Sequence, residues 1–237
     1  MGARPVAIFR FNRTEGPAYF ADWLAAQGIR WQLVPLDEGA AVPADPRAFA
    51  GIGLMGGPMS VNDALPWIAP LSALLRTAVD REVPVIGHCL GGQLLAQALG
   101  ARVTRTPVPE IGWVDVEVCD RAAQREWFAG RPAFNTFQWH YDAFALPAGA
   151  TPVLTNAFNA NQAFVVDGRH IGLQCHIEMT RDLVATWLRS GADELPNVST
   201  PTEQSADDIR RDLDARIATL HRVAGDVYAR WVQGLVH

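Results

Sequence analysis

The 237-residue chain is 49% apolar and 19% charged, and its 20 basic and 25 acidic side chains give a net charge of −5. This length is sufficient for one large α/β domain, while the acidic balance argues against nucleic acid or an anionic membrane as a partner and leaves a small-molecule substrate as the expected ligand. The sequence does not begin with a charged segment followed by an apolar one, as a secretory leader does. It also has no apolar run that approaches the length of about 20 residues needed to span a bilayer, so we expect a cytoplasmic protein.

Strand and helix patterns alternate along the first part of the chain. Apolar runs and their flanking turn residues predict strands over residues 5–11, 30–36 and 51–55 and helices over residues 17–27 and 66–79. This alternation is typical of a parallel sheet with helices on both faces, in which functional sites form at the carboxyl ends of the strands.

The stretch of residues 83–100 carries the strongest chemical signal. A short β-branched run passes through Gly87 and becomes a helical pattern, and Cys89 lies at the joint. Because Gly87 and Gly91 have no Cβ, the backbone can turn sharply on either side of the cysteine. The free N–H groups of the first helical turn favour a thiolate there. The pattern therefore predicts a nucleophile elbow with Cys89 as the nucleophile.

Two other interpretations of Cys89 stay open at this point. A lone cysteine is usually a small buried hydrophobe, and a glycine-flanked joint can bind phosphate, although the Gly-Gly-Gln that follows lacks the Lys-Ser/Thr of a phosphate-binding loop. The other two cysteines are Cys119 and Cys175. An odd number without metal-ligand spacing indicates reduced thiols and no metal site.

A second turn is predicted at residues 56–60, where two glycines and a proline follow the third strand. This turn and Cys89 are expected at the same edge of the sheet, so that the backbone N–H of Gly57 can point toward a carbonyl group attacked by Cys89. The alternative is an ordinary strand-to-helix turn.

The alternation of strand and helix patterns does not continue in the second half of the chain. Residues 102–118 predict short β stretches, residues 137–142 concentrate aromatic and polar side chains, and residues 163–166 and 170–175 predict two strands joined by an Asp-Gly hairpin turn. We expect residues 107–113 and 137–141 to be loops that set the width of a pocket.

His176 and Glu178 follow the last predicted strand. Residues two apart on an extended segment face the same side, so the carboxylate can orient the imidazole as a general base needs. Three other histidines, His88, His140 and His170, lack such a companion and are more simply explained as structural residues than as catalysts.

The end of the chain is expected to be helical. Thr180 predicts the N-cap of a helix that ends near Gly191, residues 191–202 predict a loop that covers the site, and apolar residues from Ser205 to Trp231 predict one long amphipathic helix. We expect a domain over residues 1–190 with residues 191–237 packed on it; the alternative role of the helix is a surface for a homo-oligomer or a partner protein.

Residues 56–60, 87–93 and 174–178, taken together and in this order, resemble the motifs of class I (triad-type) glutamine amidotransferases, particularly stand-alone proteins similar to the amidotransferase domain of GMP synthetase. The resemblance implies an α/β, flavodoxin-like, open and mostly parallel sheet with helices on both faces. It implies a triad of Cys89, His176 and Glu178.

The same resemblance implies further roles. The N–H groups of Gly57 and Leu90 would form the oxyanion hole, and Gln93 would hold the amino acid part of glutamine. Further candidate substrate-binding residues are Gln138, Trp139 and His140. No metal or organic cofactor is implied.

The expected function is hydrolysis of the glutamine side-chain amide through a γ-glutamyl thioester. One alternative is a γ-glutamyl hydrolase or peptidase, and another is a non-catalytic binding or regulatory module. Position 175 is cysteine where the family commonly has an aromatic residue. The residues after Thr180 are too few for a synthetase domain, so we expect any ammonia acceptor to be a separate synthetase or acceptor protein.

Overall fold

The computed structural model describes residues 4–236, which form an open sheet of nine strands. The strands are β1 (Val6–Arg10), β2 (Trp31–Pro35), β3 (Gly51–Leu54), β4 (Val85–His88), β5 (Val103–Val118), β6 (Ala133–Phe144), β7 (Thr151–Thr155), β8 (Ala163–Val166) and β9 (His170–Leu173). Their spatial order is β2-β1-β3-β4-β9-β8-β7-β5-β6.

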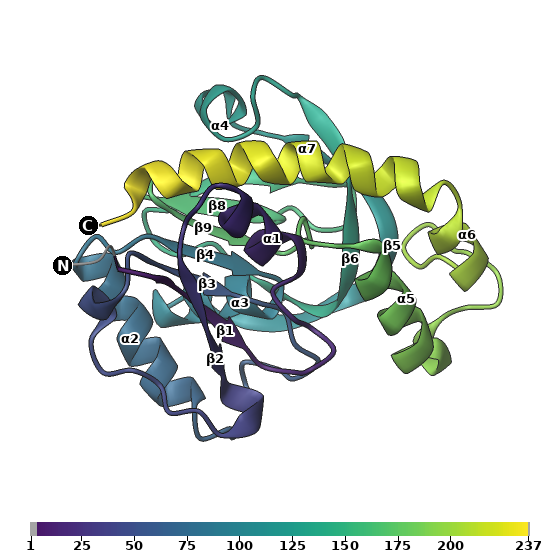
Figure 1. The fold of residues 1–237 in the computed structure, drawn as a ribbon. Helices are drawn as coiled ribbons and strands as arrows, with labels where there is room; N and C mark the ends of the chain where they lie inside the picture. Colours follow the sequence, from purple (N-terminus) through teal and green to yellow (C-terminus); the bar gives the residue numbers. More distant parts are fainter. Residues whose placement is uncertain (1–3, 237) are drawn as a thin grey trace.

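Helices cover both faces of this sheet. They are α1 (Ala18–Ala26), α2 (Ile68–Asp80), α3 (Leu90–Ala98), α4 (Arg121–Glu126), α5 (Arg181–Ser190), α6 (Ala206–Arg210) and α7 (Leu213–Trp231), with short 3-10 turns at η1 (Leu36–Glu38), η2 (Pro46–Ala48), η3 (Ala192–Glu194) and η4 (Val232–Gly234). Helices α1, α5 and α7 pack into one hydrophobic cluster, and α2 and α3 pack into another (Figure 1). The predicted flavodoxin-like α/β class is confirmed.

The sheet has a parallel and an antiparallel part. Strands β2, β1, β3, β4 and β9 run parallel, and β3, β4 and β9 are short segments in which every residue is buried. Strands β8, β7, β5 and β6 extend the sheet in antiparallel pairs. The predicted hairpin between β8 and β9 is confirmed, since Asp167 and Gly168 have φ angles of 53° and 61°, as a tight hairpin turn requires.

The antiparallel part corrects the predictions for the second half of the chain. The short stretches expected over residues 102–118 are the single long strand β5, and residues 107–113 and 137–141, expected as loops, belong to β5 and β6. The pairing of β5 with β6 shifts register between Arg105 and Glu110. This irregularity interrupts the alternation that a sequence pattern depends on, which explains why the continuous strand was not expected. The short elements α4 and β7 were not predicted either.

The C-terminal helix is also corrected at its start. The amphipathic helix expected from Ser205 is two helices, because Asp212 between α6 and α7 adopts a left-handed conformation with φ 55° and ψ 27°. Ile209 and Leu213 keep helical spacing across this break, so the apolar pattern alone could not reveal it.

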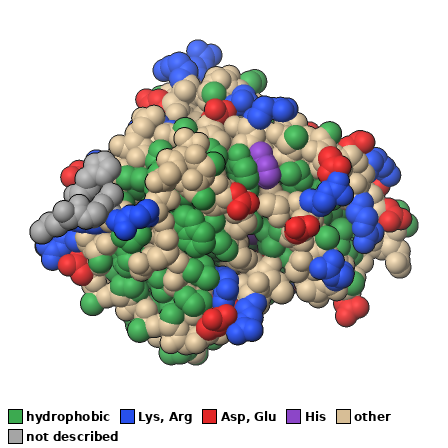
Figure 2. Space-filling model, in the orientation of Figure 1, with side chains coloured by type: hydrophobic (Ala, Val, Ile, Leu, Met, Phe, Trp, Pro, Cys, Tyr) green, Lys and Arg blue, Asp and Glu red, His purple; other side chains and the backbone are tan. Residues whose placement is uncertain are grey.

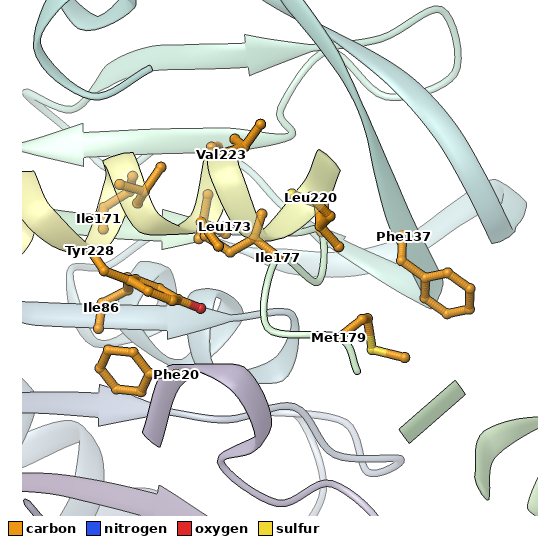
Figure 3. Close-up of a cluster of buried hydrophobic side chains, with 14 of the residues drawn as sticks. Phe20, Ile86, Phe137, Ile171, Leu173, Ile177, Met179, Leu220, Val223 and Tyr228 are labelled. Atoms are coloured by element: carbon orange, nitrogen blue, oxygen red, sulfur yellow. The ribbon is translucent and has the colours of Figure 1, made fainter. Parts of the chain in front are cut away.

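Helix α7 lies across the molecule over the strands of the parallel part (Figure 1). Figure 3 shows Tyr228 directed from the helix toward Ile86 and Phe20, in the same cluster as Leu220 and Val223. All three α7 side chains are buried. The long C-terminal helix therefore belongs to the hydrophobic cluster on this face of the sheet.

Charged side chains of both signs are mixed on the face seen in Figure 2, without a continuous patch of one sign. None of the helices between residues 4 and 236 combines the length and apolar character needed to cross a membrane.

Candidate active site

Cys89 lies between β4 and α3, at the carboxyl edge of the parallel strands. Its backbone has φ 49° and ψ −108°, a conformation that a non-glycine residue rarely adopts. The N–H of Cys89 donates to the carbonyl oxygen of Leu173 at 2.8 Å, which ties the turn to β9. The strained turn predicted from the sequence is therefore present, and the strain lies at the cysteine.

The flanking glycines are needed because backbone segments approach closely. A Cβ on Gly87 would lie 2.4 Å from the carbonyl carbon of Gly91, and a Cβ on Gly91 would lie 2.5 Å from the carbonyl oxygen of Leu54. Neither glycine has a positive φ. The elbow therefore depends on glycine for its packing, as the spacing suggested.

His176 and Glu178 form a buried pair beside the elbow. Nδ1 of His176 lies 2.7 Å from Oε1 of Glu178, and both residues are almost fully enclosed, with 1% exposure each. The N–H of His176 donates to the carbonyl oxygen of Phe137 on β6 at 2.8 Å. The two-residue spacing thus brings the imidazole and the carboxylate together, as predicted.

The pair is set up to carry charge. Burial alone would lower the pKa of His176, but the Glu178 carboxylate and the neighbouring Cys89 sulfur raise it well above its usual value. Burial would likewise raise the pKa of Glu178, but the positive charge of His176 holds it below its usual value. The raised pKa makes the His176 imidazole a stronger base, and the lowered pKa favours the ionised form of Glu178 beside it.

The sulfur of Cys89 has polar neighbours of its own. The side-chain amide of Gln174 donates to it at 3.7 Å, a hydrogen bond that stabilises a thiolate. Cys175, in contrast, is buried away from solvent, and burial raises its pKa to about 12. Cys119 is exposed and does not line the cavity. Cys89 is therefore the cysteine that combines access to a cavity with a neighbouring histidine.

A cavity of about 760 Å³ opens over Cys89. Of the candidate residues, Gly57, Gln93, Trp139 and His140 line it, and Gln138 does not. Gln138 is fully buried and donates to Gln162 at 2.7 Å. Residues 139–142 farther along β6 line the cavity, whereas Gln138 is buried beside Gln162, which in turn donates to Glu110.

Gln93 and the Gly57 turn are both tied to β6. The side-chain amide of Gln93 donates to the carbonyl oxygen of Asp142 at 2.9 Å, and the hydroxyl of Ser60 donates to the Asp142 carboxylate at 2.8 Å. Gly57 packs against the Leu90 side chain so closely that a Cβ there would lie 2.6 Å from it. The N–H of Leu90, the first residue of α3, has no acceptor within the helix.

Residues 4–236 hold no group of three or more histidine, cysteine, aspartate or glutamate side chains placed to bind a metal ion.

Sequence comparison now gives the family. A family model described as Glutamine amidotransferase class-I matches residues 20–188. The chain belongs to this family. This amidotransferase is 46% identical in sequence to a crystal structure of a glutamine amido transferase from Methylobacillus flagellatus, with a TM-score of 0.97 over 100% of this chain and 97% of that one. A glutamine amidotransferase from Thermotoga maritima is 26% identical, with a TM-score of 0.86 over 98% of this chain and 100% of that one.

Two curated relatives differ in extent. The amidotransferase is 34% identical to the GMP synthase of Aeropyrum pernix. The matched region covers 68% of this chain but only 31% of the GMP synthase. It is 30% identical to the glutamine amidotransferase-like protein YfeJ of Salmonella typhimurium, over 76% of this chain and 78% of YfeJ. The predicted family resemblance is confirmed.

Several residues that line the cavity of this amidotransferase were missed by sequence reasoning. Glu15, Arg105, Trp187 and Glu194 come from four separate segments. Glu15 follows β1, so the rule that sites form at the carboxyl edge could have pointed to it. The ring of Trp187 packs edge-on against His176 with centroids 4.7 Å apart, and no sequence pattern separates it from an ordinary core residue.

Glu194 confirms part of the expectation for the loop of residues 191–202. Its Oε2 accepts hydrogen bonds from Nε1 of Trp139 at 2.9 Å and from the hydroxyl of Tyr141 at 2.8 Å. The start of this segment therefore forms one wall of the cavity.

Proposed function

We propose that this amidotransferase hydrolyses the side-chain amide of glutamine with Cys89 as nucleophile, His176 as general base and acid, and Glu178 as the group that orients His176. The observation that carries the proposal is the placement of Cys89 at a strained strand-to-helix turn, on the cavity floor, beside the buried His176–Glu178 pair.

The reaction follows from these positions. His176 takes the proton of the Cys89 thiol, and the thiolate attacks the δ-carbon of glutamine. As the tetrahedral intermediate collapses, the imidazolium returns its proton to the leaving nitrogen and ammonia departs, which leaves a γ-glutamyl thioester. His176 then deprotonates water, which cleaves the thioester to glutamate and restores Cys89. Throughout, Glu178 stabilises the imidazolium.

The negative charge on the attacked carbonyl oxygen needs donors. We assign this role to the backbone N–H groups of Gly57 and Leu90, since Leu90 opens a helix and Gly57 packs against it. Gln93, Trp139 and His140 are assigned to the substrate because they line the cavity. Gln138 is not included in this set.

The decisive test is release of glutamate and ammonia from glutamine by the purified protein and by Cys89→Ala. The variant is expected to fold like the wild type, because removing one buried sulfur leaves only a small cavity, and to lose turnover entirely. Cys119→Ala is the matched control and should keep full activity. A Cys89→Ala protein as active as the wild type would refute the nucleophile.

We further propose that the ammonia is passed to an acceptor protein. This rests on relatives that are named GMP synthase, some of them as whole enzymes and others as one subunit of that enzyme. An amidotransferase that serves a partner is expected to hydrolyse glutamine slowly on its own, with the turn of residues 56–60 as the part that moves. Its glycines permit a peptide flip. Glutamine hydrolysis that is already fast in the isolated chain would contradict this dependence.

The size of the cavity supports a second candidate. A volume of about 760 Å³ falls in the range that holds ligands larger than a single amino acid, and Glu15, Arg105 and Glu194 place charges around it. A γ-glutamyl peptide or amine would fill such a site. Rapid hydrolysis of such a compound by the isolated protein, with glutamine as a poor substrate, would favour this candidate over the amidotransferase reaction.

A further inference from the structure

Helix α7 lies outside the segment that the family model matches, yet two of its side chains reach the His176–Glu178 segment. His221 and Tyr228 are separated by about two helical turns and therefore lie on the same face of the helix. Figure 3 shows Tyr228 directed from α7 toward Phe20 and Ile86, at the carboxyl half of the parallel strands.

Tyr228 reaches Glu178 through a histidine. The tyrosine hydroxyl lies 3.2 Å from Nε2 of His88, and the same nitrogen lies 4.0 Å from Oε2 of Glu178. The three side chains are almost fully buried. Oε2 of Glu178 has no hydrogen-bond partner of its own, and the His88 ring packs against this oxygen without a hydrogen bond.

The hydrogen bonds fix the protonation of His88. Its Nδ1 faces the carbonyl oxygen of Leu54 at 3.3 Å, and a carbonyl oxygen only accepts, so Nδ1 carries the proton. Burial lowers the pKa of His88, which keeps the ring neutral and leaves Nε2 as an acceptor. Tyr228 donates to it, because burial raises the pKa of the tyrosine well above its usual value and keeps the hydroxyl protonated.

His221 supports the backbone of the same segment. Its Nε2 donates to the carbonyl oxygen of Met179 at 2.8 Å, and its ring stacks on Tyr19 with centroids 3.5 Å apart. The N–H of Tyr19 in turn donates to the carbonyl oxygen of Glu178 at 3.1 Å. The backbone of the Glu178 segment is therefore held by α1 and α7, and the His88 ring, which Tyr228 fixes by its hydrogen bond, packs against the Glu178 carboxylate.

We propose that α7 positions the general base of the reaction: Tyr228, acting through His88, and His221, acting through Met179 and Tyr19, hold Glu178 in place behind His176. The proposal rests on the assignment of His176 and Glu178 to catalysis. His88, His221 and Tyr228 touch no substrate and are positioning residues.

The consequence is confined to the steps that develop charge on His176. If Glu178 can turn away, the imidazolium loses stabilisation, so the thiolate of Cys89 forms at higher pH and the maximal rate falls. Substrate binding in the cavity is unaffected, because neither α7 residue lines it. The expected signature is a lower kcat with an unchanged KM.

The first test is Tyr228→Phe, which removes the hydroxyl and keeps the ring that packs against Phe20. We expect kcat to fall about fivefold, the effect of one hydrogen bond, with KM unchanged. The matched control is Trp231→Phe on the same helix, which loosens the packing of α7 on Phe20 without reaching the Glu178 segment. It is expected to lower the melting temperature and to leave kcat unchanged.

The second test separates the ring of His221 from its hydrogen bond. His221→Phe keeps an aromatic ring to stack on Tyr19 and removes the donor to Met179, whereas His221→Gln restores a donor. We expect His221→Phe to lower kcat and His221→Gln to recover most of it. If one of the two variants fails to fold, the variant at the other position serves as the test, because Tyr228 and His221 both act on the segment that contains Glu178.

The third readout is independent of the substrate. Iodoacetamide alkylation of Cys89 is followed against pH, with the exposed Cys119 as an internal reference. In Tyr228→Phe and His221→Phe, the pH range over which the alkylation rate of Cys89 rises is expected to move to higher pH. The same range for Cys119 is expected to stay unchanged. If the wild type hydrolyses neither glutamine nor any γ-glutamyl compound, the proposed function fails, and this profile still decides whether α7 acts on the Cys89–His176 pair.

The positioning role is overturned if Tyr228→Phe and His221→Phe keep both the kcat and the alkylation profile of the wild type. It is equally overturned if Trp231→Phe reproduces their changes, since general loosening of α7 would then be sufficient.

Discussion

Cys89, the proposed nucleophile, and His176, the proposed base, are held in place by different means. The turn at Cys89 is made by residues adjacent to it in the sequence, with glycines two positions away on either side and one hydrogen bond to β9. The His176–Glu178 segment has little regular structure of its own and depends on β6, α1, α5 and α7. Cys89 is therefore expected to be sensitive to substitutions nearby in the sequence, and the His176–Glu178 pair to substitutions far from it.

The largest effect is expected at the elbow glycines. Gly87→Ala would push a methyl group to 2.4 Å from backbone atoms that cannot move aside, and we expect a loss of at least about 3 kcal/mol in the free energy of unfolding, the upper end for overpacking. Urea unfolding measures it. Gly16→Ala is the control, because a Cβ there meets nothing within 4 Å. Equal stability of the two variants would show that the elbow tolerates side chains.

Substitutions of His176 and Glu178 test the second region of this comparison. His176→Ala is expected to lower kcat by at least about a hundredfold, the lower end for loss of a general base. Glu178→Gln should lower kcat less, because the imidazole remains and loses only its charged partner. Steady-state kinetics on glutamine gives both values. Changes restricted to KM would make His176 and Glu178 binding residues instead.

Glu15 offers a test by pH. Burial, partly offset by His176, raises the pKa of Glu15 to about 7. An acid whose pKa is raised on folding stabilises the folded state below its unfolded pKa, and this contribution is lost as the pH rises through about 7. Glu15→Gln is therefore expected to gain in melting temperature over the wild type between pH 5 and pH 8. A difference that stays constant with pH would contradict the raised pKa.

The smallest effect is expected at the cavity wall. Glu194→Gln weakens the hydrogen bonds to Trp139 and Tyr141, and because Glu194 is exposed we expect KM to rise only about threefold, with kcat unchanged. Asp193→Asn, the adjacent exposed acid, serves as the control and should change neither constant. A fall in kcat at Glu194 would link this wall to the chemistry instead of to binding.

The sequence by itself determined the parallel strands, the elbow at Cys89 and the pairing of His176 with Glu178, because each follows from short-range periodicity or from contacts between residues a few positions apart. The family assignment also followed from three short motifs. Even the N-cap at Thr180 was readable, and its hydroxyl accepts from the N–H of Leu183.

Only the tertiary structure decided the remainder. Residues 103–118 form one strand that pairs with β6 on both sides of a register shift, and Gln138 is buried beside Gln162 away from the cavity. Left-handed Asp212 split the last helix without disturbing its apolar spacing. Glu15 and Glu194 approach the site from segments far apart in the chain. Such contacts depend on how distant surfaces pack, and no local pattern of residues records that packing.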